Sequence, residues 1–160
     1  MNADELRALL HYDPDTGMFT WIGKRRSGVP AHRIAGSVHK KGYINIVVMG
    51  KSYRAHRLAW FYMRGEWPKD QIDHINMIRA DNRWSNLREA TGSINQQNKR
   101  RAMVTNSTRL LGAFRNGKYF SAKIHVGGKQ RYLGNFKTPE GAHAAYLRAK
   151  LEHHKGYVPC

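Results

Sequence analysis

Residues 120–126 alternate strictly between apolar and polar side chains, from Phe120 to Val126. This alternation is typical of a β-strand that is buried on one face only. Gly127-Gly128 provides a turn into a second strand at residues 130–134, and an alanine-rich helix that begins at Pro139 is expected over residues 139–153. The last fifty residues are therefore predicted to form three short strands and one helix.

A second hairpin pattern lies in the first half of the chain. Residues 42–49 are rich in β-branched side chains, Gly50-Lys51 supplies a turn, and residues 52–55 return as a second strand. Residues 56–63 then place apolar side chains at helical spacing, and Gly65 ends the pattern. We expect a β-hairpin followed directly by a helix.

The first 39 residues are predicted to form a short helix, a turn and a basic loop. Asn2 or Asp4 can cap a helix that carries a stripe of leucines. A turn is expected at residues 13–17, where Asp, Pro and Gly each favour a turn conformation. Residues 22–34 are basic and contain Gly and Pro, so they are interpreted as a surface loop.

The composition excludes several classes of protein. Cys160 is the only cysteine, so the chain has neither a disulfide framework nor a cysteine-based zinc site. Apolar residues make up 41% of the 160 residues, which is enough for packed cores. No window approaches the roughly 18 apolar residues that span a bilayer, and the N-terminus lacks the pattern of a secretory signal. We expect a soluble, cytosolic protein of one or two small domains.

The charge points to nucleic acid as the partner. The chain has 28 Lys and Arg residues against 11 Asp and Glu, a net charge of +17. Such a charge favours nucleic acid or an anionic membrane, and no long amphipathic basic helix supports the membrane alternative. Residues 99–157 contain 13 Lys and Arg residues, and their only acidic residues are Glu140 and Glu152. The first 98 residues contain nine acidic residues.

One of those acidic residues, Asp73, directly precedes His74, and two asparagines follow at Asn86 and Asn95. A strand, a loop, a second strand and a short helix would bring the four side chains together. A carboxylate, an amide oxygen and a substrate phosphate suit one hard divalent cation. A neutral histidine can activate water, and the amide oxygen of Asn86 would fix its tautomer. The set fits phosphodiester hydrolysis, although an Asp-His pair also occurs as an ordinary loop pair.

The chain resembles two known families in succession. It resembles the HNH endonucleases of phages and mobile introns in HRLAW at residues 56–60, IDHIN at 72–76, DNR at 81–83 and NLR at 86–88, followed by Asn95. Residues 107–156, with LGNFKTPE at 133–140 and AHAAY at 142–146, resemble the AP2 DNA-binding domain that is often fused behind such nucleases.

The first resemblance implies a ββα-metal fold for residues 40–98 and a role for each site residue. Asp73 and Asn95 would hold the metal ion, His74 would be the general base, and Asn86 would orient His74. Asn95 stands where the name-giving pattern has histidine, which suits Mg²⁺, with Mn²⁺ as an alternative, better than zinc. His56 is interpreted as a structural residue beneath the site.

The loop after the Asp-His pair departs from the family pattern. Relatives commonly have a glycine after Asp-His-Ile-Asn, whereas this chain has Met77-Ile78. A glycine there would allow a positive φ, so the path of the loop and the placement of Arg79 are open at this point.

The second resemblance implies a three-stranded sheet that lies in the major groove of double-stranded DNA. Six side chains on the strands and turns are then expected to face the DNA: Arg115, Lys118, Lys123, His125, Lys129 and Arg131. Lys and Arg would contact phosphates, and Arg would in addition read guanine.

The sequence as a whole predicts an α+β protein with four parts: an N-terminal helix and basic loop region at 1–39, an HNH nuclease domain at 40–98, a basic linker at 99–108 and an AP2-like domain at 109–157. The resemblance implies a phage-encoded or homing endonuclease, acting in a host cytoplasm as a monomer or homodimer, with a nick as the product of one site. The alternatives are a non-catalytic DNA-binding protein or transcriptional regulator, and an RNA-binding or ribosome-associated protein.

Overall fold

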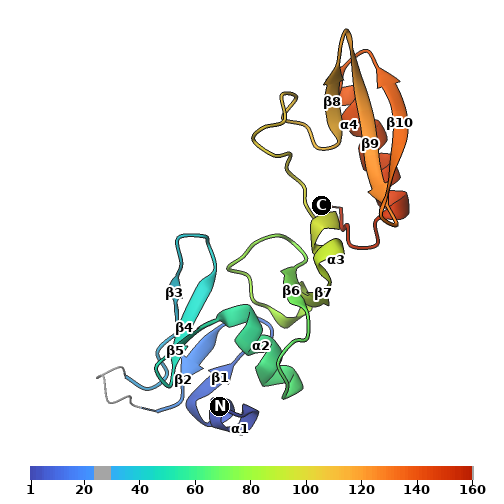
Figure 1. Ribbon diagram of the computed structural model, residues 1–160. Coiled ribbons are helices and arrows are strands. Elements are labelled where there is room, and N and C mark those ends of the chain that lie inside the picture. Colours follow the sequence, from blue (N-terminus) through green and yellow to red (C-terminus); the bar gives the residue numbers. More distant parts are fainter. Residues whose placement is uncertain (24–29, 160) are drawn as a thin grey trace. The chain divides into compact units, whose positions relative to one another are not determined.

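The computed structural model describes residues 1–23 and 30–159 (Figure 1). The chain divides into two compact units, Met1–Thr91 and Gly92–Cys160. In the described residues each unit combines helices with small antiparallel sheets, in agreement with the expected α+β class. No helix in this described part is both long and apolar enough to cross a membrane.

The first unit begins with three short elements: α1 (Ala3–Leu9), β1 (Leu10–Tyr12) and β2 (Phe19–Trp21). Asn2 caps α1, because its side chain accepts from the N–H of Glu5 while the Glu5 carboxylate accepts from the N–H of Asn2. β1 and β2 pair as an antiparallel hairpin around the turn expected at residues 13–17. The pairing itself was not predicted, since each strand has only three residues.

The expected hairpin and helix follow as β4 (Ile44–Val48), β5 (Lys51–Arg54) and α2 (Ala55–Arg64), with β3 (Ser37–Val38) at the edge beside β4. Gly50 takes a φ of 76° in the turn between β4 and β5. Gly65 ends α2 in the left-handed conformation, and its N–H donates to the carbonyl of Phe61.

The described part of the expected basic loop is paired with β2. Residues 24–29 of the loop predicted at 22–34 lie outside the described residues. Beyond them, the N–H of Trp21 donates to the carbonyl of Arg33 at 3.0 Å, and the N–H of Ala35 donates to the carbonyl of Phe19 at 2.7 Å. This part of the loop therefore extends the β1–β2 hairpin.

One hydrophobic core serves the whole first unit. Leu6, Leu10 and Phe19 from the N-terminal elements are buried in the same cluster as Leu58 of α2 and Ile72. A seven-residue helix and three-residue strands cannot bury their apolar side chains among themselves, so they pack against α2 and β4. The expected N-terminal region thus shares its core with the segment predicted to be the nuclease domain.

The first unit ends in a second hairpin, formed by β6 (Gln71–His74) and β7 (Leu87–Ala90). In its register Asp73 pairs with Arg88, and His74 pairs with Leu87. The loop between the strands ends in a 3₁₀ turn, η1 (Trp84–Asn86).

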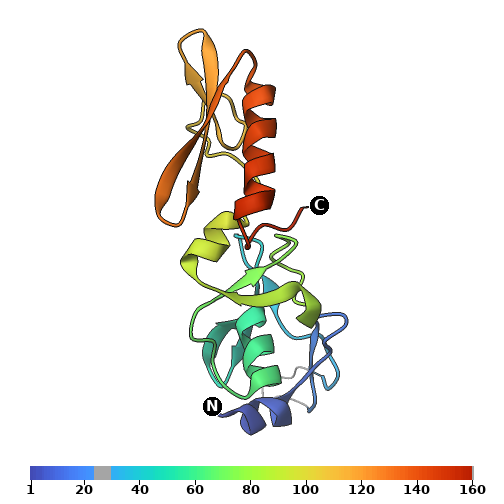
Figure 2. The same ribbon diagram turned by 90° about the vertical axis from the view of Figure 1, so that its right-hand side faces the viewer.

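The second unit contains α3 (Gly92–Gln97), β8 (Ala113–Asn116), β9 (Tyr119–Val126), β10 (Lys129–Phe136) and α4 (Pro139–His153). The strands form an antiparallel sheet in the order β10-β9-β8, and α4 runs along one of its faces (Figure 2). Ala113, Ala122 and Ala142 form the buried centre between sheet and helix. These are the three strands and one helix that the sequence predicts.

The segment expected to be a linker at 99–108 makes several contacts within the second unit. Lys150 of α4 is buried and donates to the carbonyl of Lys99, and Arg100 donates to the carbonyl of Val158 at 2.8 Å. Burial, with the nearby charge of Arg100, lowers the pKa of Lys150 to about 8. A buried ammonium group requires an acceptor, and the backbone of this segment provides one.

Candidate active site

The β6–β7 hairpin buries the predicted Asp-His pair. Asp73 is 7% exposed and His74 is 5% exposed, at the point where β6 ends and the loop begins. Both side chains belong to the first unit, as does Asn86, the third predicted site residue. The hairpin register explains this grouping, because Asn86 comes directly before the residue that pairs with His74.

Asp73 forms an ion pair across the hairpin. The Nη2 and Nε atoms of Arg88 both donate to Oδ2 of Asp73, at 2.8 and 3.1 Å. The two residues are directly opposite in the register, which is why the short carboxylate and the longer guanidinium meet. The positive charge of Arg88 compensates the negative charge of the buried Asp73 carboxylate, and the two hydrogen bonds fix the orientation of this carboxylate.

The ring of His74 is held by Asn82. Nε2 of His74 lies 3.2 Å from Oδ1 of Asn82, while Nδ2 of Asn82 donates to the carbonyl of Ala80 at 3.2 Å. Because an amide oxygen only accepts, Nε2 of His74 carries the proton and Nδ1 is the basic nitrogen. Burial lowers the pKa of His74 below its ordinary value, against the opposing effects of Asn82 and Asp73. The ring is therefore neutral at pH 7.

The amide oxygen beside Nε2 of His74 belongs to Asn82, and the role of Asn86 in orienting His74 stays a prediction. Asn86 closes the loop. Its Oδ1 accepts from the N–H of Asn76 at 3.0 Å, and its Nδ2 donates to the carbonyl of Asp81 at 2.7 Å. The two asparagines are only four residues apart, and loop closure, which the sequence does not specify, decides which one faces His74.

Asp81 also stabilises the loop. Its carboxylate accepts from Nη2 of Arg83 and from Nδ2 of Asn76, both at 2.6 Å. The hydrogen bonds from Arg83, the largest cause, lower the pKa of Asp81 to about 2. A carboxylate held in this way remains ionised and acts as a fixed acceptor for the loop.

Met77 adopts the backbone conformation that a glycine would provide, with a φ of 64°. Its N–H donates to the carbonyl of His74 at 2.9 Å, and the N–H of Ile78 donates to Oδ1 of Asn76 at 2.8 Å. These bonds hold the loop despite the strain of a left-handed, non-glycine residue. The substitution noted in the sequence therefore leaves a hydrogen-bonded loop.

Relief of this strain predicts that Met77→Gly is more stable than the parent. We expect the free energy of unfolding to rise by about 0.5–1 kcal/mol, because the left-handed conformation costs glycine nothing, although glycine loses more backbone entropy on folding. Denaturant unfolding measures the change. Ile78→Gly is the control, since Ile78 has no positive φ, and it is expected to be less stable. Equal losses in the two variants would contradict the prediction.

His56 lies beneath His74. His56 is the second residue of α2, and its side chain is buried. Its ring lies edge-on to the ring of His74, and the two ring centroids are 4.9 Å apart. Among the described residues, its Nδ1 has no hydrogen-bond partner. Burial, followed by the nearby charges of His74, Arg57 and Arg54, lowers the pKa of His56 to about 3. These contacts support the interpretation of His56 as a neutral packing residue.

The pKa of His56 predicts acid sensitivity of the first unit. Histidine in an unfolded chain has a pKa near 6.5, whereas His56 in the folded chain has a pKa of about 3. Between these two pH values the unfolded chain binds a proton at His56 and the folded chain does not. Stability is fully present above pH 6.5 and is lost as the pH falls below it. Denaturant unfolding between pH 7.5 and 4.5 should show this loss for the parent and a shallower loss for His56→Phe. Identical slopes would contradict the prediction, and His11→Ala, exposed in β1, serves as control.

Two guanidinium groups lie against a tyrosine near His74. The Cζ atoms of Arg54 and Arg79 are 4.9 and 5.1 Å from the ring centroid of Tyr43, and the Tyr43 and His74 rings are 6.0 Å apart. Arg79 is fixed further by its Nη1, which donates to the carbonyl of Lys41 at 2.9 Å. Sequence reasoning missed this group, because Tyr43 lies before β4, Arg54 lies in β5 and Arg79 lies in the loop after β6.

The N-terminal hairpin supports the loop that carries Asn82. The hydroxyl of Tyr12 donates to the carbonyl of Asn82 at 2.7 Å, and the N–H of Trp84 donates to the carbonyl of Pro14 at 2.9 Å. Gly17 lies so close to this loop that a Cβ built on it would be 2.3 Å from the nitrogen of Arg83. Residues 12–17 are thus part of the support of the site.

Asn95, the fourth predicted site residue, lies in α3 and belongs to the second unit. Its pairing with Asp73 stays a prediction. The carboxylate and amide oxygens of these two residues are hard donors that suit a small divalent cation completed by water and substrate phosphate. Among the described residues there is no cluster of three or more His, Cys, Asp or Glu that fits a metal ion.

The strand register of the second unit separates the six predicted DNA-binding residues. Lys123 and His125 lie on the open face of the sheet, and Lys118 lies at the turn between β8 and β9. Arg115, Lys129 and Arg131 pair with Phe120, Val126 and Ile124, so the register places them in alternation with the residues of the open face, and all three are exposed. The role of each of the six residues in DNA binding stays a prediction.

Comparisons with known proteins find a match to the first of the two families in part of the chain. A family model described as HNH endonuclease matches residues 53–97, a range that includes His56, Asp73, His74, Asn86 and Asn95. Searches of curated proteins and of solved structures find no match. HNH nucleases generally use a divalent metal ion, and a nuclease domain implies DNA as its substrate. The match over residues 53–97 indicates that the protein is a nuclease, a phosphodiester hydrolase.

Proposed function

We propose that the protein is a metal-dependent HNH endonuclease of the homing or phage type that nicks double-stranded DNA, with the sheet of the second unit as its targeting module. The observation that carries the proposal is the buried Asp73-His74 pair, in which Asn82 holds Nε2 of a neutral His74. Such a histidine presents a basic nitrogen, which a general base in hydrolysis requires.

In the proposed reaction Nδ1 of His74 accepts a proton from the water that attacks phosphorus, while Asn82 keeps the ring in one tautomer. The P–O3′ bond breaks, which leaves a 5′ phosphate and a 3′ hydroxyl. Asp73 and Asn95 would hold a divalent cation, probed first as Mg²⁺ or Mn²⁺, which when bound supplies charge stabilisation at the phosphate and the leaving oxygen. Arg88 orients the Asp73 carboxylate for this role.

Arg54 and Arg79 are proposed to bind the DNA backbone beside the reacting phosphate. Both guanidinium groups lie near Tyr43, and Tyr43 neighbours His74. Phosphate binding by arginine is charge-assisted and favours one orientation of the strand. The net charge of +17 supports DNA as the substrate through long-range attraction.

Cleavage of supercoiled plasmid tests the proposal. The full chain with Mg²⁺ or Mn²⁺ is expected to produce relaxed circles, EDTA is expected to abolish them, and Asp73→Asn is expected to lower the rate by at least about 10²-fold, a loss of several kcal/mol of charge stabilisation. Asp70→Asn is the matched control, because Asp70 is an exposed carboxylate three residues before Asp73. Linear product would point to a dimer or to paired nicks.

A different outcome would favour a non-catalytic DNA-binding protein. In that outcome neither the parent nor Asp73→Asn cleaves plasmid or genomic DNA, while the protein still shifts the mobility of DNA on a gel. Cleavage that persists in EDTA would contradict the metal-dependent mechanism. The genomic substrate is included because a rare target sequence can be absent from one plasmid.

A further inference from the structure

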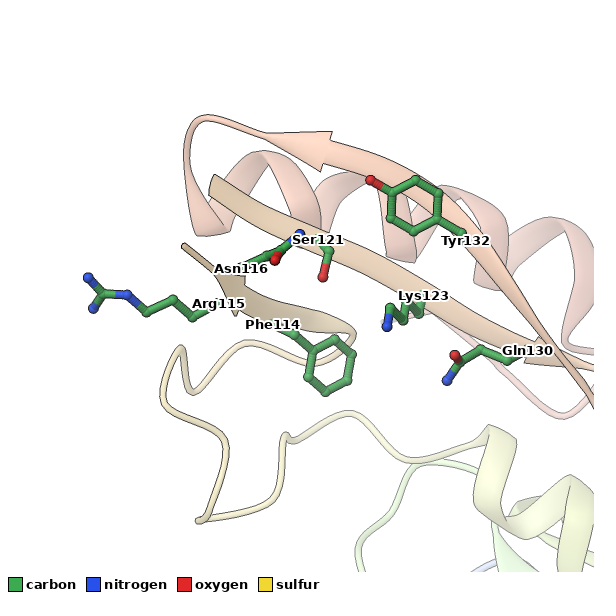
Figure 3. A pocket seen from close by; sticks show the side chains of 7 residues that line it. All are labelled: Phe114, Arg115, Asn116, Ser121, Lys123, Gln130 and Tyr132. Atoms are coloured by element: carbon green, nitrogen blue, oxygen red, sulfur yellow. The ribbon is translucent and has the colours of Figure 1, made fainter. Parts of the chain in front are cut away.

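The open face of the sheet in the second unit carries a shallow cavity of about 610 Å³. The side chains that line it come from all three strands (Figure 3): Phe114, Arg115, Asn116, Ser121, Lys123, Gln130 and Tyr132. Arg115 lies at the rim, and its side chain extends away from the other six (Figure 3). The chemistry of the cavity is therefore set by two amides, two aromatic rings, one ammonium group and the hydroxyl of Ser121.

The strand register places these groups on one surface. Tyr132 is directly opposite Lys123, and Gln130 is opposite His125, so all four lie on the same face of the β9–β10 hairpin. Phe114 pairs with Ser121 on the same face of β8. The buried Ser121 forms the floor, while the larger side chains stand above it.

Two aromatic rings on this face are exposed to solvent, Phe114 by 45% and Tyr132 by 58%. Exposed rings gathered around a cationic and amide-rich cavity are typical of a surface that binds another molecule. Nδ2 of Asn116 donates to Oδ1 of Asn135 at 3.3 Å, which orients the Asn116 amide before any ligand binds. The surface combines ordered amides with apolar contact area.

We propose that this face reads A·T base pairs in the DNA major groove, with the amides of Gln130 and Asn116 bonded to adenine and the rings of Phe114 and Tyr132 against thymine methyl groups. An amide side chain matches the N6–H donor and N7 acceptor of adenine, and apolar groups contact the thymine methyl. The inference rests on the proposed function, in which the second unit binds the DNA that the first unit cleaves.

DNA is the proposed occupant for two reasons. The positive charge of the second unit is complementary to DNA, and the proposed function already assigns DNA as the substrate of the protein. Between Lys99 and Tyr157 the chain has 13 Lys and Arg residues against two Glu, and Lys123 lies within the cavity itself. A major groove admits a two-stranded β-ribbon, and β9 and β10 form an antiparallel pair with eight residues in each strand. Guanine recognition through Arg131 is disfavoured, because its register partner is the buried Ile124 on the other face.

The test is selection of binding sites from random-sequence duplex DNA by the full chain carrying His74→Ala, which prevents cleavage. The selected sites are expected to contain A·T pairs at fixed positions. Gln130→Ala should weaken the preference at one of these by about tenfold, and Gln130→Arg should change the preferred base there to guanine. Arg131→Gln, the neighbouring exposed residue on the opposite face, is the matched control and should leave every preference unchanged.

Each other outcome overturns the inference and locates the error. Selected sites with G·C pairs at the positions that Gln130→Ala weakens would show that the face binds DNA with a different preference. Binding that no variant of Gln130, Asn116 or Tyr132 alters would show that the sheet is not the DNA interface. Plasmid cleavage is scored separately, so neither result is confused with failure of the nuclease mechanism.

Discussion

Replacing His74 by alanine is expected to lower the rate of DNA cleavage by about 10²- to 10⁴-fold, the usual contribution of a general base. The neutral ring is buried and carries its proton on Nε2 toward Asn82, and in the described part of the first unit the ring of His56 lies against it. His56 has its pKa lowered to about 3 and lies beneath His74, so it is not expected to take over.

The measurement is the initial rate of plasmid relaxation under saturating metal ion, with DNA affinity determined in parallel. His74→Ala should bind DNA as the parent does, because the side chain contributes no charge at pH 7. His11→Ala, which removes an exposed histidine from β1, should cleave at the parental rate. If His74→Ala cleaves within about threefold of the parent, the general-base assignment is wrong.

Gly17→Ala is expected to cost about 3 kcal/mol of stability and to reduce cleavage as well, through strain and steric overlap. Gly17 has a φ of 74°, and a Cβ there would be 2.3 Å from the nitrogen of Arg83 and 2.4 Å from the carbonyl carbon of Asn82. Backbone atoms at that distance must move. Their displacement shifts Asn82, whose side chain contacts the ring of His74.

Gly50→Ala separates the two causes of this loss. Gly50 has nearly the same φ, 76°, yet a Cβ there would meet no atom within 4 Å. It should therefore lose only the cost of the left-handed conformation, about 1 kcal/mol, and keep full activity. Denaturant unfolding gives both free energies, and plasmid relaxation at a temperature where both variants are folded gives the rates. Equal losses of stability in the two variants would contradict the close-contact explanation.

The two predictions address different parts of one arrangement. In the proposed mechanism His74 acts on the water, whereas Gly17 affects the site through the backbone of Asn82 and through the turn at residues 13–17. A reduced rate in Gly17→Ala with unchanged DNA affinity would identify the N-terminal hairpin as a support of catalysis. Tyr12 connects the same hairpin to the carbonyl of Asn82.

The sequence by itself determined the features that depend on neighbouring residues. The hairpin around Gly50, the helix ended by Gly65, the strand at Phe120–Val126 and the helix that begins at Pro139 each follow from local periodicity and turn chemistry. The nuclease motif could be found in the sequence for the same reason. Asp73 and His74 are adjacent, and the strands β6 and β7 follow one another in the chain.

Only the tertiary structure decided which groups complete the site. Tyr12 and Asn82 are 70 residues apart, and Arg79 reaches the carbonyl of Lys41 across 38 residues. Contacts of that separation depend on how one shared core packs the elements, which no local pattern specifies. The choice between Asn82 and Asn86 as the partner of His74 likewise depends on how the loop closes, because the two residues offer the same amide group.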